Sequence, residues 1–208
     1  MTLSTLTRTY VRGTWGDLTN EQQQILVKRE TADRETSPYP SPWTAEILDS
    51  LKAVIKASGL TLADYDLGPH NRGNFLRVSG DEDALALSGP RALAWLENNL
   101  LGPLRIPWTG PKRRDLARYG RYYRPGLVAP CPFTGVYCDE DYLDALRTNL
   151  RDGMSIYAAY NALAGTAATL MENDLDAWTD PDNVAEDLAN QDTVYEWEEG
   201  HPKALRQV

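Results

Sequence analysis

The stretch WTAEILDSLKAVIKASG, residues 43–59, decides the class of fold that the rest of the chain has to satisfy. Its apolar side chains recur every three or four residues, which places them on one face of a helix. Pro42 stands where the first turn of a helix tolerates proline, and Gly59 is typical of a helix end. The stretch therefore predicts a helix whose buried face is formed by Trp43, Ile47, Leu48, Leu51, Val54 and Ile55.

Further helices are expected on both sides of this one. Thr19 and Gln22 have the spacing of a capping box at the start of a polar surface helix. Gly102 is expected to end a later helix that carries leucines on one side. In addition to the helix at 43–59, helices are expected over residues 20–35, 88–101, 139–150, 154–171 and 181–190.

Strands are expected where apolar and polar residues alternate. Two of them flank the turn GPHNRG at residues 68–73 and predict a hairpin. The expected strands cover residues 5–12, 60–67, 74–79 and 193–197. Strands combined with helices in this order predict an α+β fold, with a mostly antiparallel sheet and several packed helices.

The length and composition fit one packed domain. The chain has 208 residues, of which 42% are hydrophobic and 25% charged, as in ordinary globular proteins. We expect a single α+β domain over residues 1–208, with an irregular basic loop at about 103–130 and an acidic helical C-terminal part at about 139–200.

The longest uncharged stretch, residues 154–171, is rich in alanine and flanked by acidic residues, so it predicts a buried core helix and not a membrane span. The first residues show no secretory signal pattern. The chain has two cysteines, which is typical of a protein that stays in the reducing cytoplasm. We therefore expect a cytoplasmic protein without contact to membranes.

The charges are unevenly distributed along a chain whose formal net charge is -9. Residues 105–124 hold seven Lys or Arg and one Asp. Arginine can neutralise phosphates and tyrosine can stack on bases, so this basic loop is a candidate contact for nucleic acid or for a protein partner. Its candidate residues are Trp108, Lys112, Arg113, Arg114, Arg118, Arg121, Tyr122 and Arg124.

An acidic segment follows, because residues 139–199 hold sixteen Asp or Glu and two Arg. Carboxylates on one surface can occupy a groove that evolved for phosphates, and thus mimic nucleic acid toward a basic protein. The alternative is a solubilising face with acids favoured at helix starts. The candidate protein-binding residues are Glu172, Asp174, Asp176, Asp180, Asp182, Glu186, Asp187 and Asp192.

Catalytic motifs are absent from the sequence. It contains no phosphate-binding loop, dinucleotide fingerprint, zinc-protease helix or serine nucleophile elbow. Cys131 and Cys138 lie seven positions apart, and a metal site would need further ligands from a chain with only His70 and His201 as histidines. We expect buried thiols, no metal, no cofactor and no enzymatic activity.

Three segments together resemble a family of phage and prophage proteins described as antitoxins of toxin–antitoxin stability systems. They are GDLTNEQQ at 16–23, CPFTGVYCDEDYL at 131–143 and VAEDLANQDTVYEWEEG at 184–200. The block from Cys131 is the most specific of the three. The resemblance implies a small accessory protein of a bacterial virus that acts in the host cytoplasm, and it assigns no catalytic residue.

The leading hypothesis is a non-enzymatic binding protein that neutralises a bacterial toxin or defence component, partly through its acidic surface. A nucleic-acid-binding accessory protein that uses the basic loop is the alternative, and a metal-dependent enzyme is the second alternative. The oligomeric state and the identity of the partner do not follow from the sequence.

Overall fold

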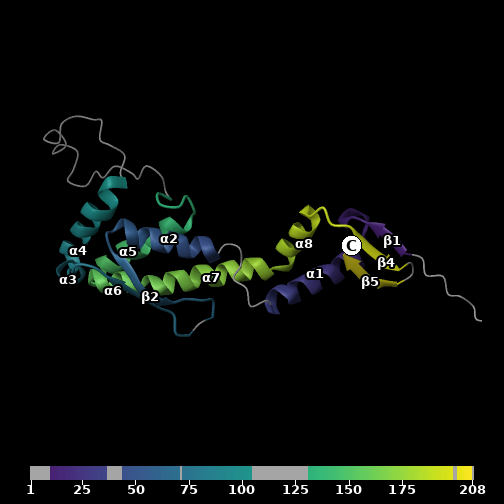
Figure 1. Cartoon of the computed structure of the whole chain (residues 1–208), viewed down its shortest axis with the longest axis horizontal. Helices are drawn as coiled ribbons and strands as arrows, with labels where there is room; N and C mark the ends of the chain where they lie inside the picture. The colour runs from purple at the N-terminus through teal and green to yellow at the C-terminus, as the bar shows by residue number, and fades with distance from the viewer. Residues whose placement is uncertain (1–9, 37–43, 71, 105–130, 199–200, 208) are drawn as a thin grey trace, which may run out of the picture. The chain divides into compact units, whose positions relative to one another are not determined.

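A computed structural model describes residues 10–36, 44–70, 72–104, 131–198 and 201–207. Helices account for most of these residues, and the strands form two small antiparallel sheets (Figure 1). The α+β class is confirmed. The expectation of a mostly antiparallel sheet as the main element is wrong, because helices account for most of the described residues. The two hairpin strands pair with each other, and the terminal strands form a separate small sheet.

The chain divides into two compact units. Unit 1 combines Met1–Ser41 with Asp174–Val208, and unit 2 comprises Pro42–Asn173. Each unit has its own group of buried hydrophobic side chains. The expected single domain over residues 1–208 stays a prediction.

Helix α2 (Thr44–Ala57) belongs to unit 2, where it packs against α5 (Cys138–Arg151). Four of the side chains predicted on its inner face, from Ile47 to Ile55, are buried, whereas Leu48 is only partly buried. Trp43 lies outside the described residues. Helix α5 also contacts α4 (Gly89–Leu96) and α6 (Ile156–Asn161). The predicted helix at 43–59 is thus confirmed from Thr44 onward.

The helix expected at 88–101 changes its geometry along its length. It runs as α4, continues as a π-helical turn, η2 (Glu97–Leu101), and ends in a 3-10 turn, η3 (Gly102–Leu104). A short helix, α3 (Glu82–Leu85), precedes it and is capped by the Asp81 side chain, which accepts from the Ala84 amide at 2.8 Å.

The uncharged stretch at 154–171 forms two helices, not the single one expected. Helix α6 ends at Asn161, and α7 (Leu163–Thr179) follows after one residue. The break coincides with a contact to the hairpin, since Asn161 Oδ1 accepts a hydrogen bond of 3.2 Å from the Val78 amide. The stretch is a core element as expected, with Tyr160 and Leu163 fully buried. Among the described residues, no helix has the length and apolar character needed to cross a membrane.

The predicted hairpin is confirmed in unit 2. Strand β2 (Thr61–Asp66) pairs antiparallel with β3 (Phe75–Ser79), with a register shift between Leu62 and Asp64. Leu76 and Val78 point into the core, and the residue between them is exposed, as the alternation predicts. The Asn74 side chain closes the connecting loop by bonding both the amide and the carbonyl of Gly68.

Unit 1 contains a three-stranded antiparallel sheet with the order β1 (Tyr10–Gly13), β4 (Tyr195–Glu198) and β5 (His201–Gln207). The strand predicted near residue 195 is confirmed as β4, whereas β5 was not expected. Helices α1 (Asn20–Thr36) and α8 (Pro181–Asn190) lie side by side next to this sheet (Figure 1). Their small core is made by Leu18, Leu26, Val184, Leu188 and Tyr195.

Candidate functional site

The pair formed by α1 and α8 begins with two capped helix starts. The Thr19 amide donates to Gln22 Oε1 at 2.9 Å and the Gln22 amide donates to Thr19 Oγ1 at 3.3 Å, which is the predicted capping box. The Asp180 carboxylate accepts from the amides of Asp182 and Asn183 at the start of α8. Both helices therefore have defined starts.

Arg34 connects the far end of α1 to α8 and to the end of α7. Its side chain is buried, and its guanidinium lies 3.8 Å from the ring centroid of Trp178. It donates to the Trp178 carbonyl at 2.8 Å and pairs with Asp187 at 2.9 Å and with Glu30 at 3.2 Å. A buried arginine needs such partners, because an unpaired buried charge is costly. Arg34 thus links the end of α1 to α8 and to the end of α7.

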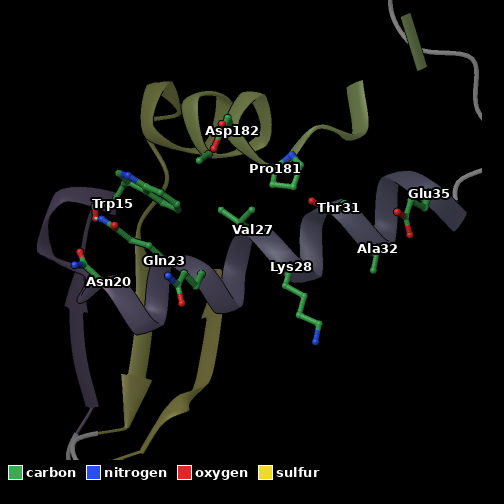
Figure 2. Close-up of a pocket in the computed structure, with 12 residues that line it drawn as sticks. Trp15, Asn20, Gln23, Val27, Lys28, Thr31, Ala32, Glu35, Pro181 and Asp182 are labelled. Carbon is green, nitrogen blue, oxygen red and sulfur yellow. The ribbon is translucent and has the colours of Figure 1, made fainter. Parts of the chain in front are cut away.

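A groove of about 650 Å³ runs along α1 beside the first turns of α8 (Figure 2). The α1 residues that line it recur every three or four positions, so they form one stripe of the helix. The indole of Trp15 stands at one end, and Val27 points toward α8. We call this feature the α1–α8 groove; it is lined by Trp15, Asn20, Gln23, Gln24, Val27, Lys28, Thr31, Ala32, Glu35, Pro181, Asp182 and Ala185.

The structure places the predicted acidic residues in different surroundings. Glu172 lies in unit 2, where it accepts the backbone amide of His70 at 3.3 Å. Asp174 is buried, with 7% of its surface exposed, so it is not part of an exposed acidic surface. The other six belong to unit 1 and are exposed: Asp176, Asp180, Asp182, Glu186, Asp187 and Asp192.

Of these exposed acids, Asp182 contributes directly to the α1–α8 groove. Glu186 follows one turn later on α8, and Asp187 is held by Arg34. Residues 174–198 contain nine Asp or Glu and no Lys or Arg. Asp182 and Glu186 are therefore exposed carboxylates on the α8 side of the groove, and α8 itself contains no Lys or Arg.

The predicted basic loop lies outside the described residues. Trp108, Lys112, Arg113, Arg114, Arg118, Arg121, Tyr122 and Arg124 all fall within residues 105–130. Its role as a contact for nucleic acid or protein stays a prediction.

Cys131 and Cys138 are both free thiols. Cys138 is fully buried as expected, whereas Cys131 is only partly buried, so the expectation of buried thiols is wrong for Cys131. Burial raises the pKa of both thiols, and nearby carboxylates such as Asp139 and Asp141 raise it further. Within the described ranges, no three His, Cys, Asp or Glu side chains come together as a possible metal site.

Asp139, next to Cys138, is a fully buried carboxylate. Its two oxygens accept hydrogen bonds from the amides of Phe133 and Thr134 and from the hydroxyls of Ser50 and Thr134. Burial raises the pKa of this carboxyl, but the hydrogen bonds outweigh it, and the pKa lies below its usual value. Because all these partners are internal, Asp139 anchors the segment before α5 to α2.

Comparison with protein-family models, curated proteins and solved structures finds no match for this chain.

Sequence reasoning missed the α1 wall of the groove and the role of Arg34. The stripe at positions 20, 23, 27, 31 and 35 contains a single large apolar residue, so no hydrophobic periodicity marked it. The one available signal was Trp15, an aromatic residue shortly before a polar helix.

Proposed function

We propose that this protein is a non-enzymatic binding protein that neutralises a bacterial protein partner, a toxin or a defence component, through unit 1. The partner contacts the α1–α8 groove and the acidic side of α8. The resemblance to phage antitoxin-like proteins motivates this class of partner, and the groove motivates the location of the contact.

The observation that carries the proposal is the acidic edge of the α1–α8 groove. Asp182 lines the groove, Glu186 is exposed one turn further along α8, and neither carboxylate forms a salt bridge within the described part of the chain. Carboxylates beside a groove whose lining mixes apolar and polar side chains favour a partner with basic residues around an apolar contact. Such an association is fast and weakens as salt screens the charges.

A charge-reversal pair tests the proposal. Asp182→Lys with Glu186→Lys changes the edge of the groove, and the matched control, Asp64→Lys with Asp66→Lys, makes the same change in net charge on the exposed strand β2. The two tagged variants and the tagged wild type are incubated with bacterial lysate, with and without nuclease treatment, at about 50 and about 500 mM salt. We expect one protein partner to be captured at low salt by the wild type and the control only.

Two results would contradict the proposal. Equal capture by the groove variant and the control variant would remove the α1–α8 groove as the site. Capture that exists only before nuclease treatment would replace a protein partner by nucleic acid, and the basic loop would then be the expected binding region.

A further inference from the structure

We propose that the part of the partner that enters the α1–α8 groove is an amphipathic α-helix, with small apolar residues on one face and Lys or Arg beside them. This inference rests on the proposed function, because it specifies the chemistry of the same site. It goes further by distinguishing a helix from an extended strand or a flat protein surface.

The walls of the groove favour a helix because they are themselves helices. The backbone amides and carbonyls within α1 and α8 are already bonded along each helix, so they offer no row of donors and acceptors to an extended chain. A strand would leave its own backbone groups unpaired against these walls. A helix satisfies its backbone internally and presents only side chains.

The length of the groove also fits a helix. Its α1 wall extends from Asn20 to Glu35, and at about 1.5 Å per residue this wall is about 22 Å long. Where α8 faces α1, the lining includes the small side chains of Ala185, Pro181 and Thr31. Small side chains in the walls allow two helices to approach closely. A helix of about four turns with small apolar residues would match the length of the α1 wall.

The charges around the groove indicate where the partner helix would carry basic residues. Asp182 on α8 and Glu35 near the end of α1 are exposed carboxylates in the lining, and Lys28 is the one cation of the lining that the structure describes. Basic residues about one turn apart on the partner helix would face Asp182 and Glu186 across the rim. Rim charges of this kind govern association rate and specificity.

Designed peptides test the inference even while the partner is unidentified. The probe is a labelled peptide of about 15 residues in which Ala and Leu recur at helical spacing and Lys fills the flanks. A second peptide has the same composition in alternating order, and a third carries Glu in place of Lys. Anisotropy titrations at about 50 mM salt should show binding of the helical Lys peptide at least about tenfold tighter than of either control peptide.

Protein variants then locate the binding. Ala185→Arg and Ala32→Arg place a long side chain in the groove from opposite walls, and each should weaken peptide binding about tenfold or more. Ala189→Arg, on the same helix but outside the lining, should leave the affinity unchanged. Circular dichroism verifies that all three variants are folded, and the two blocking variants make the test independent of one substitution.

The outcomes separate this inference from the proposed function. Equal binding of the helical and alternating peptides would overturn the helix assignment, and full binding by both blocking variants would show that the peptide binds outside the α1–α8 groove, which overturns the inference as well. The lysate capture with its charge-reversal pair would still decide the proposed function. Loss of that capture specificity would overturn both, since no partner would then use the groove.

Discussion

Two substitutions of Asp139 can separate the contribution of its charge to stability from the contribution of its hydrogen bonds. In Asp139→Asn, the amide oxygen can keep both backbone bonds from Phe133 and Thr134, which are 2.8 Å long in the wild type. The amide nitrogen then faces the hydroxyls of Ser50 and Thr134, which can turn and accept. We expect a loss of about 1–2 kcal/mol in the free energy of unfolding, because charge-assisted bonds become neutral ones.

Asp139→Ala removes the acceptor altogether. Two backbone amides lose their acceptor, at the partly buried Phe133 and the exposed Thr134, and an unpaired donor costs about 1–3 kcal/mol where water does not replace the acceptor. The expected loss is about 3–5 kcal/mol, clearly more than in the asparagine variant. The difference in free energy of unfolding between the two variants therefore measures the contribution of the hydrogen bonds. The difference between the asparagine variant and the wild type measures the contribution of the charge.

The charge contribution has a defined pH dependence. The pKa of Asp139 is lower in the folded protein than its ordinary value, so the ionised carboxylate stabilises the fold above the unfolded pKa of about 3.9. This contribution disappears as the pH falls through the folded pKa. The advantage of the wild type over Asp139→Asn should accordingly be constant near neutral pH and shrink below about pH 4.

Amide hydrogen exchange in α5 measures these differences within unit 2, so unfolding of unit 1 does not enter the comparison. Urea unfolding followed by circular dichroism provides an independent measurement. Equal stability of the alanine and asparagine variants, or a loss below about 1 kcal/mol in both, would refute the argument that Asp139 anchors the segment before α5.

Three further predictions concern other side chains of the two units. Arg34→Met should destabilise unit 1 by about 1–3 kcal/mol, and Arg34→Lys by less, as measured by exchange of the α8 amides, because it deletes the charged hydrogen bonds to the Trp178 carbonyl, Glu30 and Asp187, whose carboxylates stay accessible to water. Iodoacetamide at neutral pH should modify Cys131 before Cys138, both more slowly than a free thiol because burial raises their pKa values, and peptide mass spectrometry would show a reversed order if this reasoning were wrong. Tyr195→Phe should be neutral or slightly stabilising, because this buried hydroxyl has no hydrogen-bond partner among the described residues. Tyr160→Phe should lower the free energy of unfolding by about 1 kcal/mol, because it removes the hydrogen bond to Ser58. Urea unfolding of both variants measures the two effects.

Local signals predicted most elements of the fold. The apolar spacing of α2, the capping box at Thr19 and Gln22, and the alternation around the hairpin all act over a few residues, and each is confirmed. Strand β5 was missed because its residues, His201–Gln207, do not alternate in the way expected of a strand. Its pairing with β4 is what makes it a strand.

The candidate site was only partly foreseen. Asp182 was predicted as a binding residue and lies in the α1–α8 groove, whereas Asp174 was predicted on the surface and is buried. The difference has a physical cause, because the acids of one segment point to different sides of their helices. A count of charges along the chain does not show to which side of a helix each acidic side chain points.

The sequence alone determined helix α2 with its buried face, the capped start of α1 and the unequal distribution of charge, because each depends on residues close together in the chain. Only the tertiary structure decided that Arg34 reaches Trp178 and Asp187, and that a polar stripe of α1 becomes one wall of a groove. The arginine contacts join residues 144 and 153 positions apart. Such contacts form when the two ends of the chain pack together, and no local pattern encodes which side chains then meet.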